Sequence, residues 1–191
     1  AAPASQLGVG NYIVFNGAGN SVTVTGLSKL TTYYVAIYEF NGSAGTENYL
    51  TTSPATGHDA TLPGEVVSAQ SGDWATASTW VGSVVPTAVD NVTIAPGHTV
   101  TIPSTQSAYN LTIQNTATLL SNLPLPVAST SIRYIRIEGN TLTTNGTFGG
   151  TADAIGIECW SSVTFSGSGT LSPCRVRPAS NLGDISIMFN Q

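Results

Sequence analysis

The stretch NVTIAPGHTVTIP (91–103), together with the following NLTIQN (110–115), decides the fold class. Apolar and polar residues alternate with a period of two, and Gly, Pro or Asn interrupts each run, as expected for short strands joined by tight turns. The same alternation occurs in SVTVTG (21–26) and YYVAIYEF (33–40), and no longer stretch has the period of an amphipathic helix. The sequence therefore predicts an all-β protein.

Short β-like triplets recur along the second half of the chain, at 92–94, 111–113, 135–137, 155–157 and 185–187. The first four are about 19 to 24 residues apart, which is typical of one coil of a β-solenoid. We expect a right-handed parallel β-helix of four or five coils over 92–189, because one coil cannot bury its apolar face alone. The triplets would stack with Ile94, Ile113, Ile137 and Ile157 inside, and second strands are expected at 99–102, 116–119, 141–143 and 163–165.

A break in the pattern falls at TLPGE (61–65), where Pro and Gly separate two strand-rich segments. With 191 residues the chain has room for two small modules. We place the first module at 1–62 and the second at 63–191.

Charged residues make up 8% of the chain and the net charge is −5. Five basic residues form no stripe for a phosphate backbone, which argues against nucleic-acid binding: Lys29, Arg133, Arg136, Arg175 and Arg177. No apolar run approaches the roughly 20 residues of a membrane-spanning helix. A signal for export, if there is one, is expected outside this segment.

The segment Gly26 to Tyr38 resembles the corner between strands E and F of fibronectin type III domains, where Leu27 is followed six residues later by Tyr33. The resemblance implies that the Tyr33 hydroxyl bonds nearby backbone and that Tyr33, Val35 and Ile37 face a sandwich core. A whole sandwich needs about 100 residues. We therefore expect a partial module, completed by preceding residues of a longer chain or by a strand from a neighbouring copy.

Two stretches resemble surface proteins of bacteria that use type IX secretion. YEFNGSAGTENYLTTSPATG (38–57) is similar to the last hairpin of their repeated modules, and SGDW (71–74), Trp80, Val85-Pro86 and DNVTI (90–94) are similar to the opening of their β-solenoid regions. The resemblance implies a secreted protein located outside the cell or at the cell surface.

Parallel β-helices include polysaccharide lyases and glycosidases that place carboxylates, often with an arginine, on one sheet face. Candidates of this kind are Arg136, Glu138, Asp153, Glu158 and Asp184. We expect their rungs not to align, so we predict no catalytic residue and no enzyme, and single replacements of these carboxylates should leave function intact.

Cys159 and Cys174 lie in successive β-like stretches and away from any pair of histidines, which argues against zinc. They form a structural disulfide or are two small buried apolar residues. Trp160 is the candidate for an exposed aromatic contact, whereas Trp74 and Trp80 cap the first coil or form a sugar-stacking platform.

Other polar residues are interpreted as strand and turn residues. The pairs Thr99/Thr101, Thr116/Thr118 and Thr141/Thr143 suit the solvent side of strands, although a stacked hydroxyl ladder could bind ice. His58 and His98 are expected in turns, and Asp73, Asp90 and Asp153 either bond their own turns or hold calcium. No other cofactor is predicted.

These expectations favour a non-catalytic structural or adhesive module of a secreted bacterial cell-surface protein. Its partners would be other domains of a longer chain, neighbouring copies or a surface polysaccharide. A carbohydrate-active β-helix enzyme and a self-assembling filament subunit remain as alternatives.

Overall fold

The computed structural model describes residues 9–42, 46–121, 132–149, 155–171, 175–179 and 187–189. The chain forms two compact units, Ala1–Leu62 and Pro63–Gln191. Within the described ranges the regular structure consists of β-strands and two short 3₁₀ helices. No helix in these ranges is long and apolar enough to cross a membrane.

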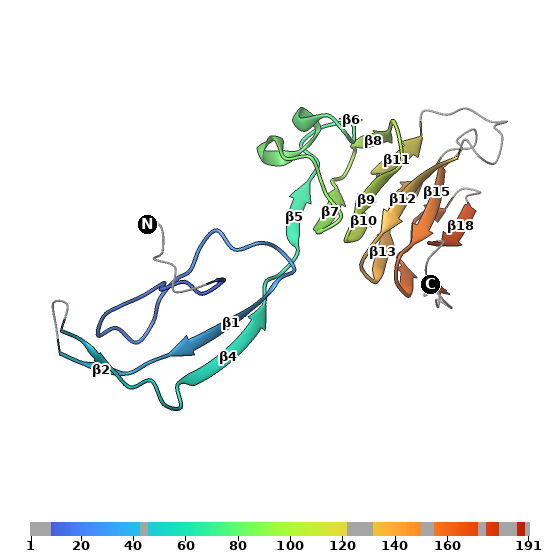
Figure 1. The fold of residues 1–191 in the computed structure, drawn as a ribbon. Coiled ribbons are helices and arrows are strands. Elements are labelled where there is room, and N and C mark those ends of the chain that lie inside the picture. The colour runs from blue at the N-terminus through green and yellow to red at the C-terminus, as the bar shows by residue number, and fades with distance from the viewer. Residues whose placement is uncertain are drawn as a thin grey trace. The chain divides into compact units, whose positions relative to one another are not determined.

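The first unit contains two antiparallel strand pairs (Figure 1). Strand β1 (Thr32–Ile37) pairs with β4 (Ala55–Ala60), and β2 (Phe40–Asn41) pairs with β3 (Asn48–Tyr49). The strand expected at 21–26 is absent from the assigned strands, so this expectation is wrong for the chain. Alternation alone does not make a strand, since the backbone also needs a neighbour for its hydrogen bonds.

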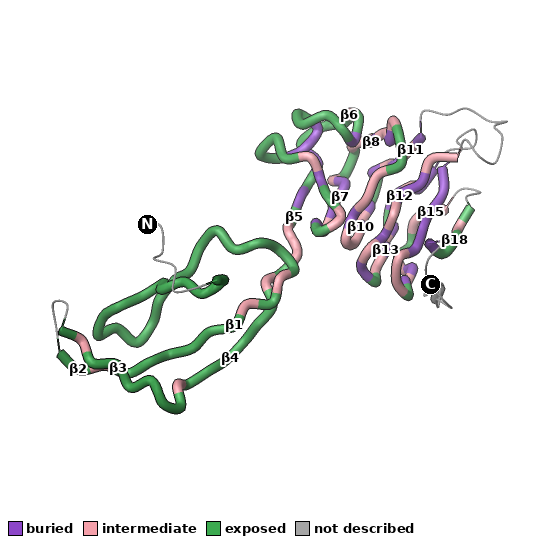
Figure 2. Tube along the Cα trace, viewed as in Figure 1, coloured by how far each residue is buried: buried purple, intermediate pink, exposed green. Residues whose placement is uncertain are grey.

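The tyrosine at the expected corner makes the bond that the resemblance implied, because the Ser28 backbone N–H donates to the Tyr33 hydroxyl at 2.9 Å. The buried face does not form. Val35 is 54% exposed and Ile37 is 66% exposed, which corrects the expectation that they face a core. Figure 2 shows nearly all described residues of this unit exposed.

The second unit is a parallel β-solenoid of about four turns with three sheets. The first sheet comprises β5 (Gly64–Val67), β7 (Asp90–Ile94), β10 (Asn110–Ile113), β13 (Thr141–Thr144), β16 (Val163–Ser166) and β19 (Ile187–Phe189). The second comprises β6 (Gly72–Asp73), β8 (Thr99–Ile102), β11 (Thr118–Ser121), β14 (Thr147–Phe148) and β17 (Thr170–Leu171). The third comprises β9 (Gln106–Ala108), β12 (Arg133–Ile137), β15 (Ile155–Cys159) and β18 (Arg175–Pro178).

Alternation places one set of side chains from each strand in the core. In the first sheet Val92 pairs with Leu111 and Leu111 pairs with Leu142, and all three are buried. Because the strand period is two, one register holds an entire column inside the core while the intervening Thr and Asn face outward. The expected parallel solenoid of about four coils is confirmed.

The expected stacking of the triplets is wrong in one respect. Ile94 and Ile113 lie in the first sheet, but Ile137 and Ile157 lie in the third, and the strands expected as second strands at 141–143 and 163–165 belong to the first. All four isoleucines are buried. Each complete coil carries three strands, so apolar triplets of different sheets follow one another at intervals that resemble a coil length.

The first coil ends in a pair of packed tryptophans. Trp74 and Trp80 are buried, their rings meet edge to face with centroids 5.0 Å apart, and the Trp80 indole N–H donates to the Trp74 carbonyl at 2.7 Å. The 3₁₀ helices η1 (Ala77–Thr79) and η2 (Val81–Ser83) flank Trp80. The two rings are therefore core residues of the terminal coil and present no platform to a sugar.

Hydroxyl groups form columns on the outer side of two sheets. Thr118 pairs with Thr99 and Thr147 in the second sheet, and Thr112 pairs with Thr93 and Thr143 in the first. The expected pairing of Thr116 with Thr118 on one strand is wrong, because Thr116 lies in a turn at φ 64°. The threonine ladders thus run over two different sheets.

Candidate binding face on the third sheet

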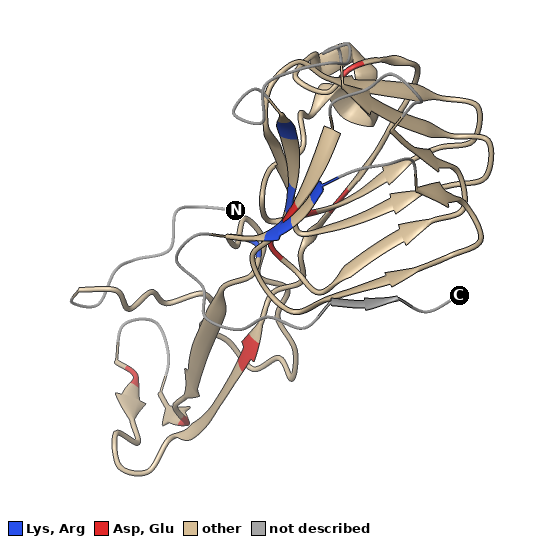
Figure 3. Ribbon diagram, turned by 90° about the vertical axis from the view of Figure 1, so that its right-hand side faces the viewer, with Lys and Arg blue, Asp and Glu red and all other residues tan. Residues whose placement is uncertain are grey.

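Four of the five basic residues of the chain lie on two strands of the third sheet: Arg133, Arg136, Arg175 and Arg177. Figure 3 marks Lys and Arg in blue and Asp and Glu in red along the ribbon. The strands β12 and β18 both pair with β15, so the register brings these arginines to the sides of one central strand. We call the outer surface of β12, β15 and β18, with Trp160, the arginine face.

Glu158 is the centre of this face. It pairs with Arg136 on one side and with Arg177 on the other, and its side chain is only 6% exposed. Arg136 Nε donates to Oε2 at 2.6 Å, and Arg177 Nε donates to Oε1 at 3.0 Å. Arg177 Nη2 forms an ion pair with Oε1 at 2.7 Å. The neighbouring isoleucines point inward, so alternation itself turns these three charges to the outside.

An aromatic ring lies beside the ion pairs. The Arg177 guanidinium carbon is 3.9 Å from the centroid of the Tyr134 ring, a cation–π contact. Tyr134 is opposite Gly156, and a Cβ at Gly156 would come within 2.6 Å of Tyr134 Cε1. Glycine is required there because the tyrosine ring occupies the space that a side chain would need.

The Tyr134 hydroxyl is buried and has no hydrogen-bond partner among the described residues. Leaving such a group unpaired costs about 1–3 kcal/mol. Unpaired buried groups are uncommon in native proteins. The indole N–H of the core residue Trp74 is a second such group among the described residues.

Trp160 follows β15 directly and closes the cluster. Its indole N–H donates to Glu158 Oε2 at 3.1 Å, and the Arg136 guanidinium carbon is 5.7 Å from the ring centroid. Trp160 is half-buried, so part of its ring faces solvent. Glu158 therefore holds two guanidinium groups and one indole in fixed positions.

The two carboxyl groups near this face have opposite electrostatic environments. Burial raises the pKa of Glu158, but the hydrogen bonds from Trp160, Arg136 and Arg177 outweigh it, and the net pKa lies below the usual value. The pKa of Glu138 is raised by burial and by the charge of Glu158, against the lowering effect of Arg136. Glu158 is thus an anchored carboxylate whose oxygens are occupied by donors, which suits neither a general acid nor a general base.

Several sequence-based site expectations change at this face. Arg136 and Glu158 were expected on rungs that do not align, but they are direct partners across β12 and β15, so that expectation was wrong. Glu138 follows β12 directly. Asp153 and Asp184 lie outside the described residues. Sequence reasoning missed Tyr134 and Arg177. The alternation in RYIRI and RVRP places both on the outer side of their strands, but only the register shows that they face each other.

The Cys159 thiol lies on the inner side of β15 and is fully buried. Burial, and to a smaller extent the charge of Glu158, raises its pKa to about 11. Cys174 lies outside the described residues, so the disulfide stays a prediction. In the third sheet, Arg175, the residue after Cys174, pairs with Gly156, which precedes Cys159 by three positions.

The other candidate residues bond within their own surroundings. The Asp90 carboxylate accepts hydrogen bonds from the Thr87 amide at 2.9 Å and from its hydroxyl at 2.6 Å, which closes a turn. Asp73 lies in β6, and the described residues contain no group of three His, Cys, Asp or Glu side chains that could hold a metal ion. His98 lies beside a turn and its Nδ1 is 2.8 Å from the Ser68 hydroxyl, whereas His58 lies in β4, which corrects its expected turn position.

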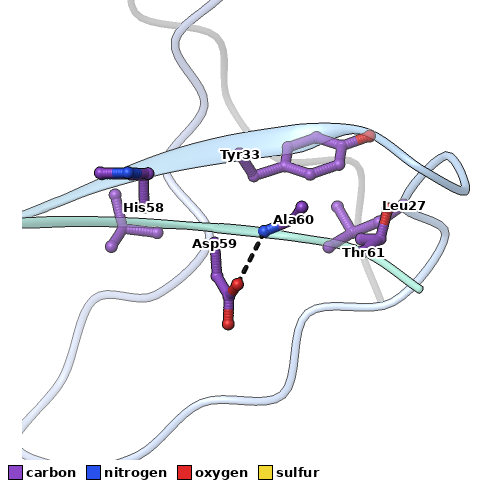
Figure 4. A pocket seen from close by; sticks show the side chains of 7 residues that line it. Leu27, Tyr33, His58, Asp59, Ala60 and Thr61 are labelled. Carbon is purple, nitrogen blue, oxygen red and sulfur yellow. Dashed lines mark hydrogen bonds between the residues drawn. The ribbon is translucent and has the colours of Figure 1, made fainter.

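The first unit carries an open hollow beside β1 and β4 (Figure 4). Its lining is mostly apolar and comprises Leu27, Tyr33, Val35, His58, Asp59, Ala60 and Thr61. The Asp59 carboxylate accepts a hydrogen bond from the Ala60 amide at 2.8 Å. The hollow offers no convergent polar groups comparable with those around Glu158.

Comparison of this chain with protein-family models, with curated proteins and with solved structures finds no match.

Proposed function

We propose that the chain is a non-catalytic structural or adhesive module of a secreted bacterial cell-surface protein. The observation that carries the proposal is the parallel pairing of the described strands in three sheets around an apolar core. Such a stack satisfies its backbone groups through successive coils and presents outer faces lined by strands. The resemblance of 38–57 and 71–94 to bacterial surface proteins supports the location.

The chemistry of the arginine face supports contact rather than catalysis. Glu158 accepts hydrogen bonds from Arg136, Arg177 and Trp160, so it has little capacity left to take a proton from a substrate. General acid–base catalysis would need a carboxyl whose pKa is near the working pH, whereas this one is lowered.

The proposal is tested by incubating the full chain with neutral and acidic polysaccharides. New reducing ends would report hydrolysis, and ultraviolet absorption of unsaturated ends would report elimination. We expect neither above the level of a boiled sample. Product formation that is lost in Glu138→Gln, with the fold retained, would favour the β-helix enzyme instead.

A filament subunit is a second candidate, and the exposed apolar residues of the first unit favour it. Val35, Ile37 and Tyr34 on β1 are 54%, 66% and 79% exposed. Exposed apolar strands tend to pair with another chain. Mass measured by light scattering at several concentrations separates the two candidates. The measured mass increases with concentration for a filament subunit and stays constant for a monomeric spacer.

A further inference from the structure

We infer that the arginine face binds an anionic polysaccharide, with the guanidinium groups of Arg136, Arg175 and Arg177 holding its carboxylate or sulfate groups. The exposed part of the Trp160 ring contacts a sugar ring. The inference rests on the proposed function of a non-catalytic contact surface and names the class of ligand that this surface takes.

The first argument is the concentration of positive charge. The arginine face carries Arg136, Arg175 and Arg177 against Glu138 and Glu158, a net charge of +1, in a chain whose net charge is −5. Arg133 has the parity of the inward isoleucines and donates to the Ile102 carbonyl, so it is not counted. A charged surface that serves only solubility needs no such segregation of sign. A local positive field on an acidic chain attracts anions to this face.

The second argument is that the guanidinium groups are fixed before a ligand arrives. Arg136 uses Nε for Glu158, and Arg177 uses Nε and Nη2, while 41% and 47% of these side chains remain exposed. Among the described residues the other N–H groups of these two guanidiniums have no hydrogen-bond acceptor, so they are available to a second anion. Glu158 already holds both guanidinium groups in position. Ligand binding therefore does not have to order them, and its entropic cost is lower.

The third argument separates a polymer from a single small anion. Arg136 and Arg177 lie on strands to either side of β15, so their backbones are about 10 Å apart, two strand spacings. Arg175 adds a third, exposed cation on β18. Repeated anionic groups on one chain can reach all three cations at once, and this multivalency strengthens binding beyond one contact.

The fourth argument favours a sugar over other polyanions. Trp160 presents part of an indole ring beside the cations, and a flat ring edged by polar groups suits the apolar face of a sugar. A polysaccharide with carboxylate or sulfate groups fits both features.

The experiment uses the full chain and measures affinity by isothermal titration calorimetry at low and high salt. The probes are polygalacturonate for carboxylates, dextran sulfate for sulfate esters, unmodified dextran as the neutral control and single-stranded DNA as a polyanion without sugar acids. We expect one or both anionic glycans to bind, dextran not to bind, and DNA to bind at least about tenfold more weakly.

Two substitutions test the residues. Arg175→Gln removes an exposed cation that the core does not need and should weaken binding about three- to tenfold. Arg136→Lys keeps the charge but loses the planar fork, and should also weaken binding. Lys29→Gln removes the same charge from the first unit and should change affinity by less than about twofold.

The inference is overturned if neither anionic glycan binds, if DNA binds as tightly as the glycans, or if Lys29→Gln weakens binding as much as Arg175→Gln. Shortening of the polymer during titration would instead refute the non-catalytic function and leave the ligand class standing. The two proposals therefore fail through different readouts.

Discussion

Replacing Glu158 by Gln is the substitution that most directly tests the account of the arginine face. The side chain keeps its shape but loses its charge, and its new amide N–H₂ faces arginine donors where Glu158 accepted their hydrogen bonds. Charge-assisted hydrogen bonds contribute about 1.5–3 kcal/mol each, and breaking a fully buried pair costs about 3–5 kcal/mol. The Arg136 and Arg177 side chains are 41% and 47% exposed, so water can replace part of the lost interactions. We expect the free energy of unfolding to fall by about 2 kcal/mol.

The assay is urea unfolding of the second unit at pH 7, followed by circular dichroism and by tryptophan fluorescence. Glu138→Gln is the matched control, because it removes the same charge from the same neighbourhood. The pKa of Glu138 is raised in the folded state by burial, which means that its ionised form opposes folding. We therefore expect Glu138→Gln to be neutral or stabilising at pH 7 while Glu158→Gln destabilises.

The pH dependence follows from the lowered pKa of Glu158. A carboxyl group with a lowered pKa stabilises the fold above its unfolded pKa of about 4.5, and that contribution disappears as the pH falls through the folded value. The difference in stability between the wild type and Glu158→Gln should persist from pH 7 to about 5 and close below 4.5. Equal stability of the two proteins at pH 7 would refute the reasoning.

Three further outcomes are expected. Ile113→Ala, in the buried column of the first sheet, should cost about 2–5 kcal/mol in unfolding free energy, whereas Ile37→Ala, at a site 66% exposed, should cost less than about 0.5 kcal/mol; equal losses would contradict the assigned burial. Because the pKa of the buried Cys159 thiol is raised to about 11, it should resist iodoacetamide at pH 8 until the chain unfolds, and the mass of unfolded, unreduced protein shows whether it pairs with Cys174. Amides of β1 and β4 should exchange with deuterium much faster than those of β7 and β10 in a dilute monomer, and slow exchange there would mean that the first unit is stable without a partner.

The sequence was sufficient for the fold class of the second unit but not for its register. Alternation and turn residues identified the strands, and the inward isoleucines were identified correctly. The assignment of strands to sheets failed because Val92 pairs with a residue 19 positions later, Leu111, whereas Leu111 pairs with Leu142, 31 positions later. Spacing measured between similar triplets cannot distinguish the next coil from the next sheet when coil lengths vary.

The candidate site was only partly visible in the sequence for the same reason. Arg136 and Glu158 were recognised as chemistry-bearing residues, but their pairing depends on the register of β12 and β15. The contact of Arg177 with Tyr134 depends in addition on the register of β15 and β18, and on the room that Gly156 leaves for the ring. These are tertiary facts that no local propensity encodes, because outward positions of a strand are not constrained by the core.

Gly156 indicates that the arginine face is more than a by-product of the solenoid. Glycine weakens a strand, because it has no side chain to pack and the unfolded chain gains freedom, a cost of roughly 0.5–1 kcal/mol relative to Ala. The flanking Ile155 and Ile157 are buried core residues, so the inner side of β15 is built for stability while the outer side is not. The glycine leaves room for the Tyr134 ring, and the Arg177 guanidinium lies over that ring while it pairs with Glu158. A spacer needs none of these contacts, since Thr or Val at position 156 would make a stronger strand, whereas a surface that holds two guanidinium groups in place for a ligand needs all of them.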